Sequence, residues 1–107
     1  MQVAVQQKDT AEMQVLRRTA GRWLKRKREE AGLSQRQLAD ILGFEYYTFV
    51  SQLETGRGRI PPERYEDWAR ALKIESREFV YILMRYYDPI TFSLLFPDAE
   101  NIDLKVG

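Results

Sequence analysis

Three glycines divide the centre of this chain into short segments, and their positions limit the possible folds more than any other feature. Gly32, Gly43 and Gly56 each follow a stretch whose apolar residues recur at helical spacing. Glycine readily adopts the left-handed backbone conformation that ends many α-helices, so each of the three is expected to end one. We therefore predict a short helix at Gln35–Leu42, a tight turn at Gly43, and a second short helix at residues 46–55.

Apolar spacing predicts further helices on both sides of this pair. From about Met13, a stripe of apolar residues indicates a first helix that ends at Gly32, after which Ser34 can cap the next helix. Later helix starts are marked by Pro61-Pro62-Glu63, by Ser76 and by Asp88-Pro89. The pattern favours an all-α fold, a compact bundle of five or six helices. The apolar residues of the two short helices are expected in its core: Leu38, Leu42, Phe49, Val50 and Leu53.

The composition excludes the commonest kinds of active site. The chain of 107 residues contains no cysteine and no histidine, which removes disulfides, thiolate metal sites and the most frequent metal ligand and general base. We find no paired catalytic carboxylates, no metal-ligand spacing and no nucleophile with its base, so we expect no catalytic residue, no metal and no cofactor. No stretch is apolar enough for a signal peptide or a membrane span, which favours a cytoplasmic protein without a membrane partner.

Charge is distributed unevenly along the chain. The net charge is only +1, yet between Arg17 and Arg36 eight cations face only two anions, Glu29 and Glu30. A second basic cluster follows Gly56 and contains Arg57, Arg59 and Arg64. Such runs are usually solvated helix faces, so the charge pattern alone does not identify a partner.

The segment LSQRQLADILGFEYYTFVSQLETGRGRIP, which begins at Leu33, resembles the helix-turn-helix family of phage repressors and Cro proteins, also called the XRE family. The resemblance implies a lambda-repressor-like DNA-binding domain and extends over about residues 17–83. Gly43 and Val50 are separated by one residue more than is usual in this family. The longer turn leaves the start of the second motif helix open by about one position. The motifs that carry the resemblance are Leu33-Ser34-Gln35, Gln37-Leu38-Ala39, Leu42-Gly43, Val50-Ser51-Gln52-Leu53-Glu54 and Gly56.

The resemblance also implies which side chains read DNA bases. In this motif the second helix enters the major groove with its N-terminal residues at the base edges. Tyr47, Thr48, Ser51 and Gln52 match the reading positions, and Tyr46 joins them because of the extra residue. Glutamine can pair bidentately with adenine, which makes Gln52 the leading candidate. For the two tyrosines, contact with DNA and packing against Phe44 or Phe49 remain open alternatives.

Other positions match the family's phosphate contacts and a structural ion pair. Gln35 opens the first motif helix, whose N-terminus attracts anions, and Arg36 follows it. Arg57 and Arg59 lie in the loop after the second motif helix, where the family contacts the DNA backbone. The resemblance further implies that Arg28 pairs with Glu54 to join the first and third helices. Weaker phosphate candidates are Lys25, Arg26 and Lys27.

The C-terminal part is more apolar than one core requires. Residues 86–96 contain an apolar run that either packs back on the first helix or forms the seam of a homodimer. We accordingly divide the chain into an N-terminal arm (1–12), a helix-turn-helix domain (13–87) and a possible dimerisation segment with its tail (88–107). The function expected is a dimeric repressor that binds double-stranded DNA at a palindromic operator in a bacterial or phage context, associated with the nucleoid. The alternative is an antitoxin that binds a protein partner and represses its own promoter.

Overall fold

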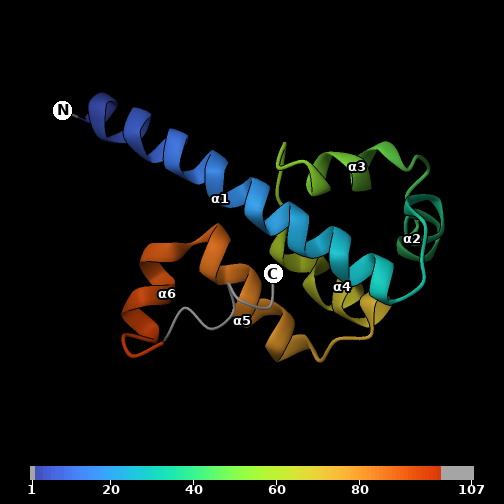
Figure 1. Cartoon of the computed structure of the whole chain (residues 1–107). Helices are drawn as coiled ribbons and strands as arrows, with labels where there is room; N and C mark the ends of the chain where they lie inside the picture. The colour runs from blue at the N-terminus through green and yellow to red at the C-terminus, as the bar shows by residue number, and fades with distance from the viewer. Residues whose placement is uncertain (1, 100–107) are drawn as a thin grey trace.

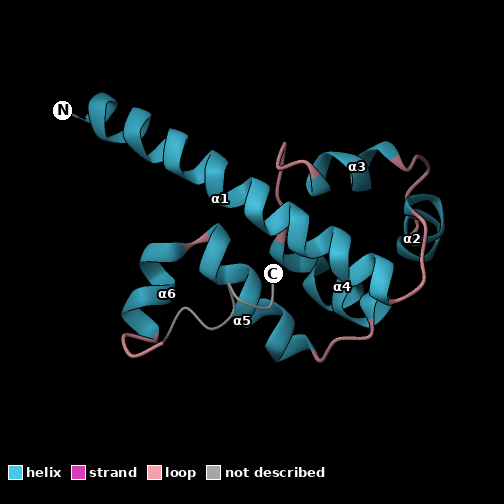
Figure 2. Ribbon diagram, in the orientation of Figure 1, coloured by secondary structure: helices cyan, strands magenta, loops and turns pink. Residues whose placement is uncertain are grey.

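The computed structural model describes residues 2–99, which fold into helices without any strand (Figure 1, Figure 2). α1 crosses the molecule diagonally, α2 to α5 lie along its C-terminal half, and α6 lies beside α5 (Figure 1). The prediction of an all-α fold with five or six helices is confirmed. The elements follow the order α1 (Gln2–Glu30), α2 (Gln35–Leu42), α3 (Thr48–Glu54), the 3-10 turn η1 (Pro62–Arg64), α4 (Tyr65–Leu72), α5 (Ser76–Tyr87) and α6 (Pro89–Leu95).

The first helix begins earlier than its apolar pattern predicts. α1 starts at Gln2 instead of near Met13, so residues 2–12, which we expected to form an arm, continue the helix. These residues include glutamine, alanine, lysine and glutamate, which all favour helix. Apolar residues do not recur at helical spacing in this stretch of the sequence, so apolar periodicity gives no signal for a helix there. The division of the chain into three functional parts stays a prediction, and residues 100–107 of the expected tail lie outside the described range.

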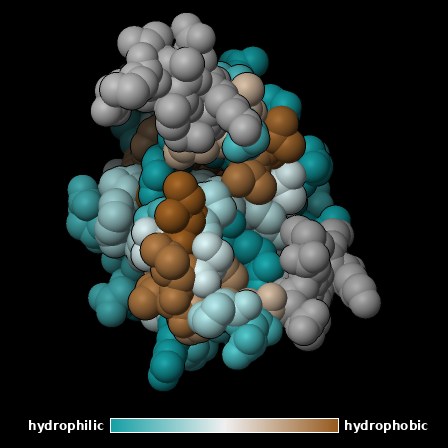
Figure 3. All heavy atoms as spheres, turned by 90° about the vertical axis from the view of Figure 1, so that its left-hand side faces the viewer, coloured by the Kyte–Doolittle hydropathy of each residue, from teal (hydrophilic) through white to brown (hydrophobic). Residues whose placement is uncertain are grey.

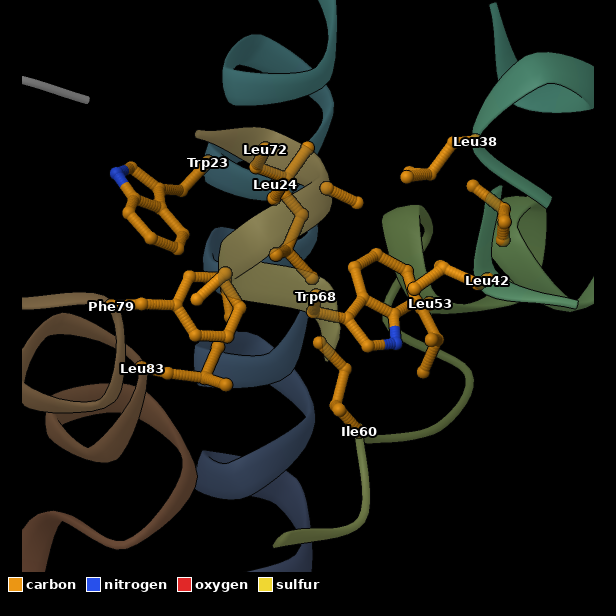
Figure 4. Packing of buried hydrophobic residues seen from close by; sticks show 14 of the residues in the cluster. Trp23, Leu24, Leu38, Leu42, Leu53, Ile60, Trp68, Leu72, Phe79 and Leu83 are labelled. Atoms are coloured by element: carbon orange, nitrogen blue, oxygen red, sulfur yellow. The ribbon is translucent and has the colours of Figure 1, made fainter. Parts of the chain in front are cut away.

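The core forms where α1 meets the remaining helices. Trp23 and Phe79 pack with their ring centroids 5.7 Å apart, while Trp68 lies farther along the core and is 1% exposed. Leu24 of α1 lies between the Trp23–Phe79 pair and Trp68 (Figure 4). Full burial of such large side chains contributes about 1.5–3 kcal/mol each. The other large side chains that are fully buried are Tyr87, Leu38, Leu53, Ile60, Leu83 and Val50.

Close contact between α1 and α3 depends on two glycines. A Cβ atom at Gly21 would lie 2.3 Å from the carbonyl oxygen of Glu54, which is inside the van der Waals limit. Gly56 has a positive φ of 83°, and a Cβ there would lie 2.8 Å from the backbone nitrogen of Arg18. The two helices can therefore approach this closely only because both positions lack a side chain.

The C-terminal helix packs on α5. Phe92 is buried, and its ring lies 5.1 Å from the ring of Tyr81 on α5. Ile90, Leu94 and Leu95 instead face solvent, with exposed fractions of 69%, 77% and 60%. Apolar side chains gather on one face of the molecule (Figure 3). Ile90 lines a pocket with Met13 and Leu16 of α1, so packing on the first helix, one of the two alternatives for this segment, does not account for Leu94 and Leu95.

Candidate nucleic-acid interface

Both ends of α2 are fixed by local hydrogen bonds. The Ser34 hydroxyl accepts from the backbone N–H of Gln37 at 3.0 Å, and the Gln37 side chain accepts from the backbone N–H of Ser34 at 2.8 Å. This reciprocal capping box satisfies two donors that a helix start would otherwise leave unpaired. At the other end, Gly43 adopts a left-handed conformation with φ 79°. These contacts set the length of α2 and the direction of the chain leaving it.

The turn after α2 is anchored by an aromatic side chain. The ring of Phe44 contacts Phe49 edge to face at 4.9 Å between centroids, and it lies 6.4 Å from Trp68. The guanidinium of Arg64 stacks over Phe44 at 5.0 Å and also donates to the carbonyl of Leu42 at the end of α2. The turn is therefore tied to the core on one side and to η1 on the other.

The extra residue of the motif is accommodated in this turn. α3 spans Thr48–Glu54, so it is shorter at both ends than the predicted helix at residues 46–55. Tyr47 is its N-terminal boundary residue, and the carbonyl of Tyr47 accepts from the backbone N–H of Ser51 at 3.1 Å. Tyr46 lies outside the helix. The inserted residue thus lengthens the connection and leaves the helix itself regular.

α3 buries one face and exposes the other. Val50, Leu53 and Glu54 are buried, whereas Thr48 and Gln52 are exposed and Ser51 is half-buried. Phe49, which we expected in the core, is 40% exposed because its ring packs edge-on against Phe44 at the surface. The polar outer face of α3 contains three of the five predicted base-reading residues.

The two tyrosines before α3 are turned to solvent. Tyr46 is 64% exposed and Tyr47 is 48% exposed. In residues 2–99, Phe44 pairs with Phe49 and Trp68, and neither tyrosine joins these ring contacts. Both phenol groups are thus available at the surface beside Thr48.

A buried ion pair joins α1 to α3. The guanidinium of Arg28 donates from Nε to Oε2 of Glu54 at 2.6 Å and from Nη2 to Oε1 at 3.1 Å. A third hydrogen bond runs from Nη1 of Arg28 to the carbonyl of Leu33 at 2.8 Å. Arg28 is 7% and Glu54 6% exposed, so each charge depends on the other for compensation. The pair that the family resemblance implies is therefore present.

The four predicted phosphate-binding residues differ in their exposure and in the contacts that their side chains already make within the protein. Gln35 donates from Nε2 to Oε1 of Glu54 at 2.9 Å, which ties the start of α2 to the buried ion pair. The guanidinium of Arg59 lies over the ring of Tyr87 at 4.8 Å. Arg57 is exposed, and Arg36 is exposed with a carboxylate of Asp40 at 3.5 Å. Arg36 and Arg57 are consequently the more accessible of the four.

The buried side chain of Tyr87 anchors the loop between α3 and η1. The hydroxyl of Tyr87 accepts from the backbone N–H of Ile60 at 3.1 Å. Burial raises the pKa of Tyr87 to about 12, since the ionised phenolate would lose its hydration, and the hydrogen bond from Ile60 opposes this shift only partly. The neutral phenol therefore anchors the loop that carries Arg57.

Three of these supporting residues were not identified from the sequence. Gly21 lies within α1, where glycine lowers helix stability by about 1 kcal/mol relative to alanine. An unfavourable residue at this position is the one sequence signal that Gly21 has a packing role. Arg64 and Tyr87 contact residues far away in the chain, and no local spacing indicates such contacts.

Comparison with known families agrees with this geometry. Residues 24–79, slightly more than half of the chain, match the helix-turn-helix family. The chain belongs to the XRE-type helix-turn-helix family. This is a family of DNA-binding regulators, and the match includes α2, α3 and α4 together with the C-terminal end of α1. No match was found among curated proteins.

Two further properties concern residues 2–99. None of the helices there is both long and apolar enough to span a membrane. No group of acidic side chains in the same range is arranged to hold a metal ion.

Proposed function

We propose that this helix-turn-helix protein is a sequence-specific transcriptional regulator that reads double-stranded DNA with α3 in the major groove. The observation that supports this most strongly is the division of α3 into two faces. Its inner face is held by the buried pair of Arg28 and Glu54, and its outer face presents Thr48 and Gln52 to solvent. A helix fixed in this way can present polar side chains to base edges without a further loss of backbone freedom on binding.

In this proposal the side chains around α3 have two roles. Gln52 pairs with an adenine, Thr48 and Ser51 contact neighbouring bases, and the exposed hydroxyls of Tyr46 and Tyr47 contact the edge of the site. Phosphate groups bind at the start of α2 and in the loop after α3. Their proposed ligands are Gln35, Arg36, Arg57 and Arg59, of which Arg36 and Arg57 need no rearrangement.

We further propose that the protein acts as a homodimeric repressor at a palindromic operator. The sequence of α6 contains no charged residue, and Ile90, Leu94 and Leu95 expose most of their surface. Two copies of such a face can pack together without like-charge repulsion. A two-fold dimer would place its two α3 helices at half-sites about one helical turn apart, roughly 34 Å.

The same apolar face would also suit an antitoxin that binds another protein. The deciding experiment is selection of bound sites from random duplex DNA by the purified protein alone. The regulator predicts enrichment of one site with two-fold symmetry and a fixed half-site spacing. Failure to enrich any sequence, together with a second protein that co-purifies in a defined ratio, would instead support the antitoxin.

A further inference from the structure

A basic stripe lies on α1 next to α3 and outside the helix-turn-helix motif itself. We define this stripe by three cations, Arg18, Arg22 and Lys25, whose side chains are all exposed. Their spacing of four and three residues places them on one side of the helix. None of the three forms an ion pair with a carboxylate in the part of the chain that the structure describes.

The two glycine contacts fix the position of the stripe relative to α3. Arg18 directly adjoins Gly56, the residue before Arg57, because a Cβ on Gly56 would lie within 3 Å of the Arg18 backbone. Gly21, which touches the backbone of Glu54, lies between Arg18 and Lys25 along α1. The stripe therefore runs along the edge of the α1–α3 contact, and α1 passes close to α3 in the same region (Figure 1).

Helical geometry places this edge beside the outward face of α3. At about 100° per residue, Ser51 and Thr55 lie between the side chain of Glu54, which contacts α1, and the outward side chain of Gln52. From Gln52 toward α1, the protein surface therefore passes first over Ser51 and Thr55 and then reaches the basic stripe. The stripe continues the positive charge of Arg57 along that side.

We propose that the stripe binds the phosphate backbone of the DNA that flanks the major-groove site. This inference rests on the proposed DNA-reading role of α3 and adds a contact that the motif itself does not contain. Arg18 and Lys25 are seven residues apart, which corresponds to about 10 Å along a helix. One DNA strand carries a phosphate every 3.4 Å or so along the duplex axis, so about three phosphates fit within this length. Among the α1 residues whose side chains the structure describes, Glu29 alone adds a negative charge to this side of the helix, at the end away from Arg18.

The test compares two variants that lose equal charge. The first replaces Arg18, Arg22 and Lys25 by glutamine, which keeps a polar stem on α1. The control replaces Arg70, Lys73 and Arg77 by glutamine, which removes three exposed cations at α4 and the start of α5. Binding to the selected site and to a random-sequence duplex is measured by fluorescence anisotropy over a range of salt concentrations. Circular dichroism melts verify that both variants fold.

The stripe variant is expected to lower the slope of log K against log salt by about 2 to 3, since each phosphate contact contributes about 0.9. The loss should be equal on the selected and random duplexes because phosphates carry no sequence information. The control should keep the wild-type slope. Ethylation interference should show that wild-type protein needs flanking phosphates that the stripe variant does not.

Three results would overturn the inference. If wild-type protein binds its site and both variants lose the same amount of slope, the effect is one of total charge and the stripe makes no phosphate contact. If the stripe variant keeps the full slope, the conclusion is the same. If wild-type protein binds no duplex DNA, the proposed function fails and this inference fails with it.

Discussion

Gln52 is exposed on α3, a helix whose opposite face is buried, and this arrangement makes its role testable in isolation. Replacing Gln52 by alanine removes the side-chain amide, with its carbonyl acceptor and its NH2 donor, but no core contact. We expect a loss of about 1–3 kcal/mol in binding free energy at the selected site and relaxed choice at one base position. Repeating the site selection with the variant measures both effects. Gln14→Ala, a change at an exposed glutamine of α1, is the control, and an unchanged site preference would exclude Gln52 as a reader.

Arg28 should affect stability more than any exposed cation. Changing Arg28 to alanine leaves the Glu54 carboxylate buried without its partner, and we expect this to cost about 3–5 kcal/mol in free energy of unfolding. Arg36→Ala removes a pair whose side chains are 59% and 60% exposed, so it should cost less than about 1 kcal/mol. Urea denaturation of both variants gives the comparison. Equal stability of the two would mean that the buried pair contributes nothing.

The buried tyrosine gives a second residue-scale prediction, one that depends on pH. The pKa of Tyr87 is raised to about 12 by burial, whereas an unfolded tyrosine ionises near 10. The unfolded state therefore loses this proton at a lower pH than the native state, and the stability that the neutral phenol contributes is lost between about pH 10 and 12. Stability curves of wild-type protein and Tyr87→Phe should converge over this range. Parallel curves would contradict the assignment.

At the scale of the elements, the contact between α1 and α3 leaves no space for a side chain at Gly21. Gly21→Ala places a methyl group against backbone atoms of Glu54 and Leu53, which cannot turn aside as a side chain could. We expect the helices to separate, at a cost of about 1–3 kcal/mol in stability, with weaker DNA binding because α3 shifts. Thermal melts and anisotropy measure the two effects. Gly58→Ala is the control, since its Cβ would meet only the Leu53 side chain at 3.6 Å. If the two variants behaved alike, the close approach would have no structural role.

The elements also differ in how well their sequence predicts them. The ends of α2 follow from local chemistry, because Ser34, Gln37 and Gly43 contact backbone within a few residues. The N-terminal start of α1 was misplaced because its first residues have no apolar stripe. α3 was predicted too long because the extra turn residue could lie either in the loop or in the helix. Residues that act across the fold, such as Arg64 and Gly21, leave no periodic signal.

On the scale of the whole molecule, the candidate interface with DNA and the exposed face of α6 belong to different helices, so the two surfaces can be changed separately. Tyr87 at the end of α5 hydrogen-bonds Ile60 in the loop after α3, and α6 begins two residues later. One short segment thus connects the proposed dimer face to the loop that carries Arg57. Association through α6 could therefore orient two reading helices without direct contact between them.

The proposed dimer predicts a specific response to charge on α6. Leu94→Glu places a carboxylate on a side chain that is 77% exposed, so the monomer should keep its fold while the apolar contact between copies is lost. Sedimentation velocity should show a dimer for wild-type protein and a monomer for the variant. Ile41→Glu makes the same kind of change at an exposed residue of α2 and should leave the dimer intact. On a palindromic duplex, the variant should bind with reduced affinity, because occupation of one half-site no longer recruits the second copy. A wild-type protein that sediments as a monomer both free and on DNA would show that one copy of α3 acts alone, and the exposed face of α6 would then require a different partner.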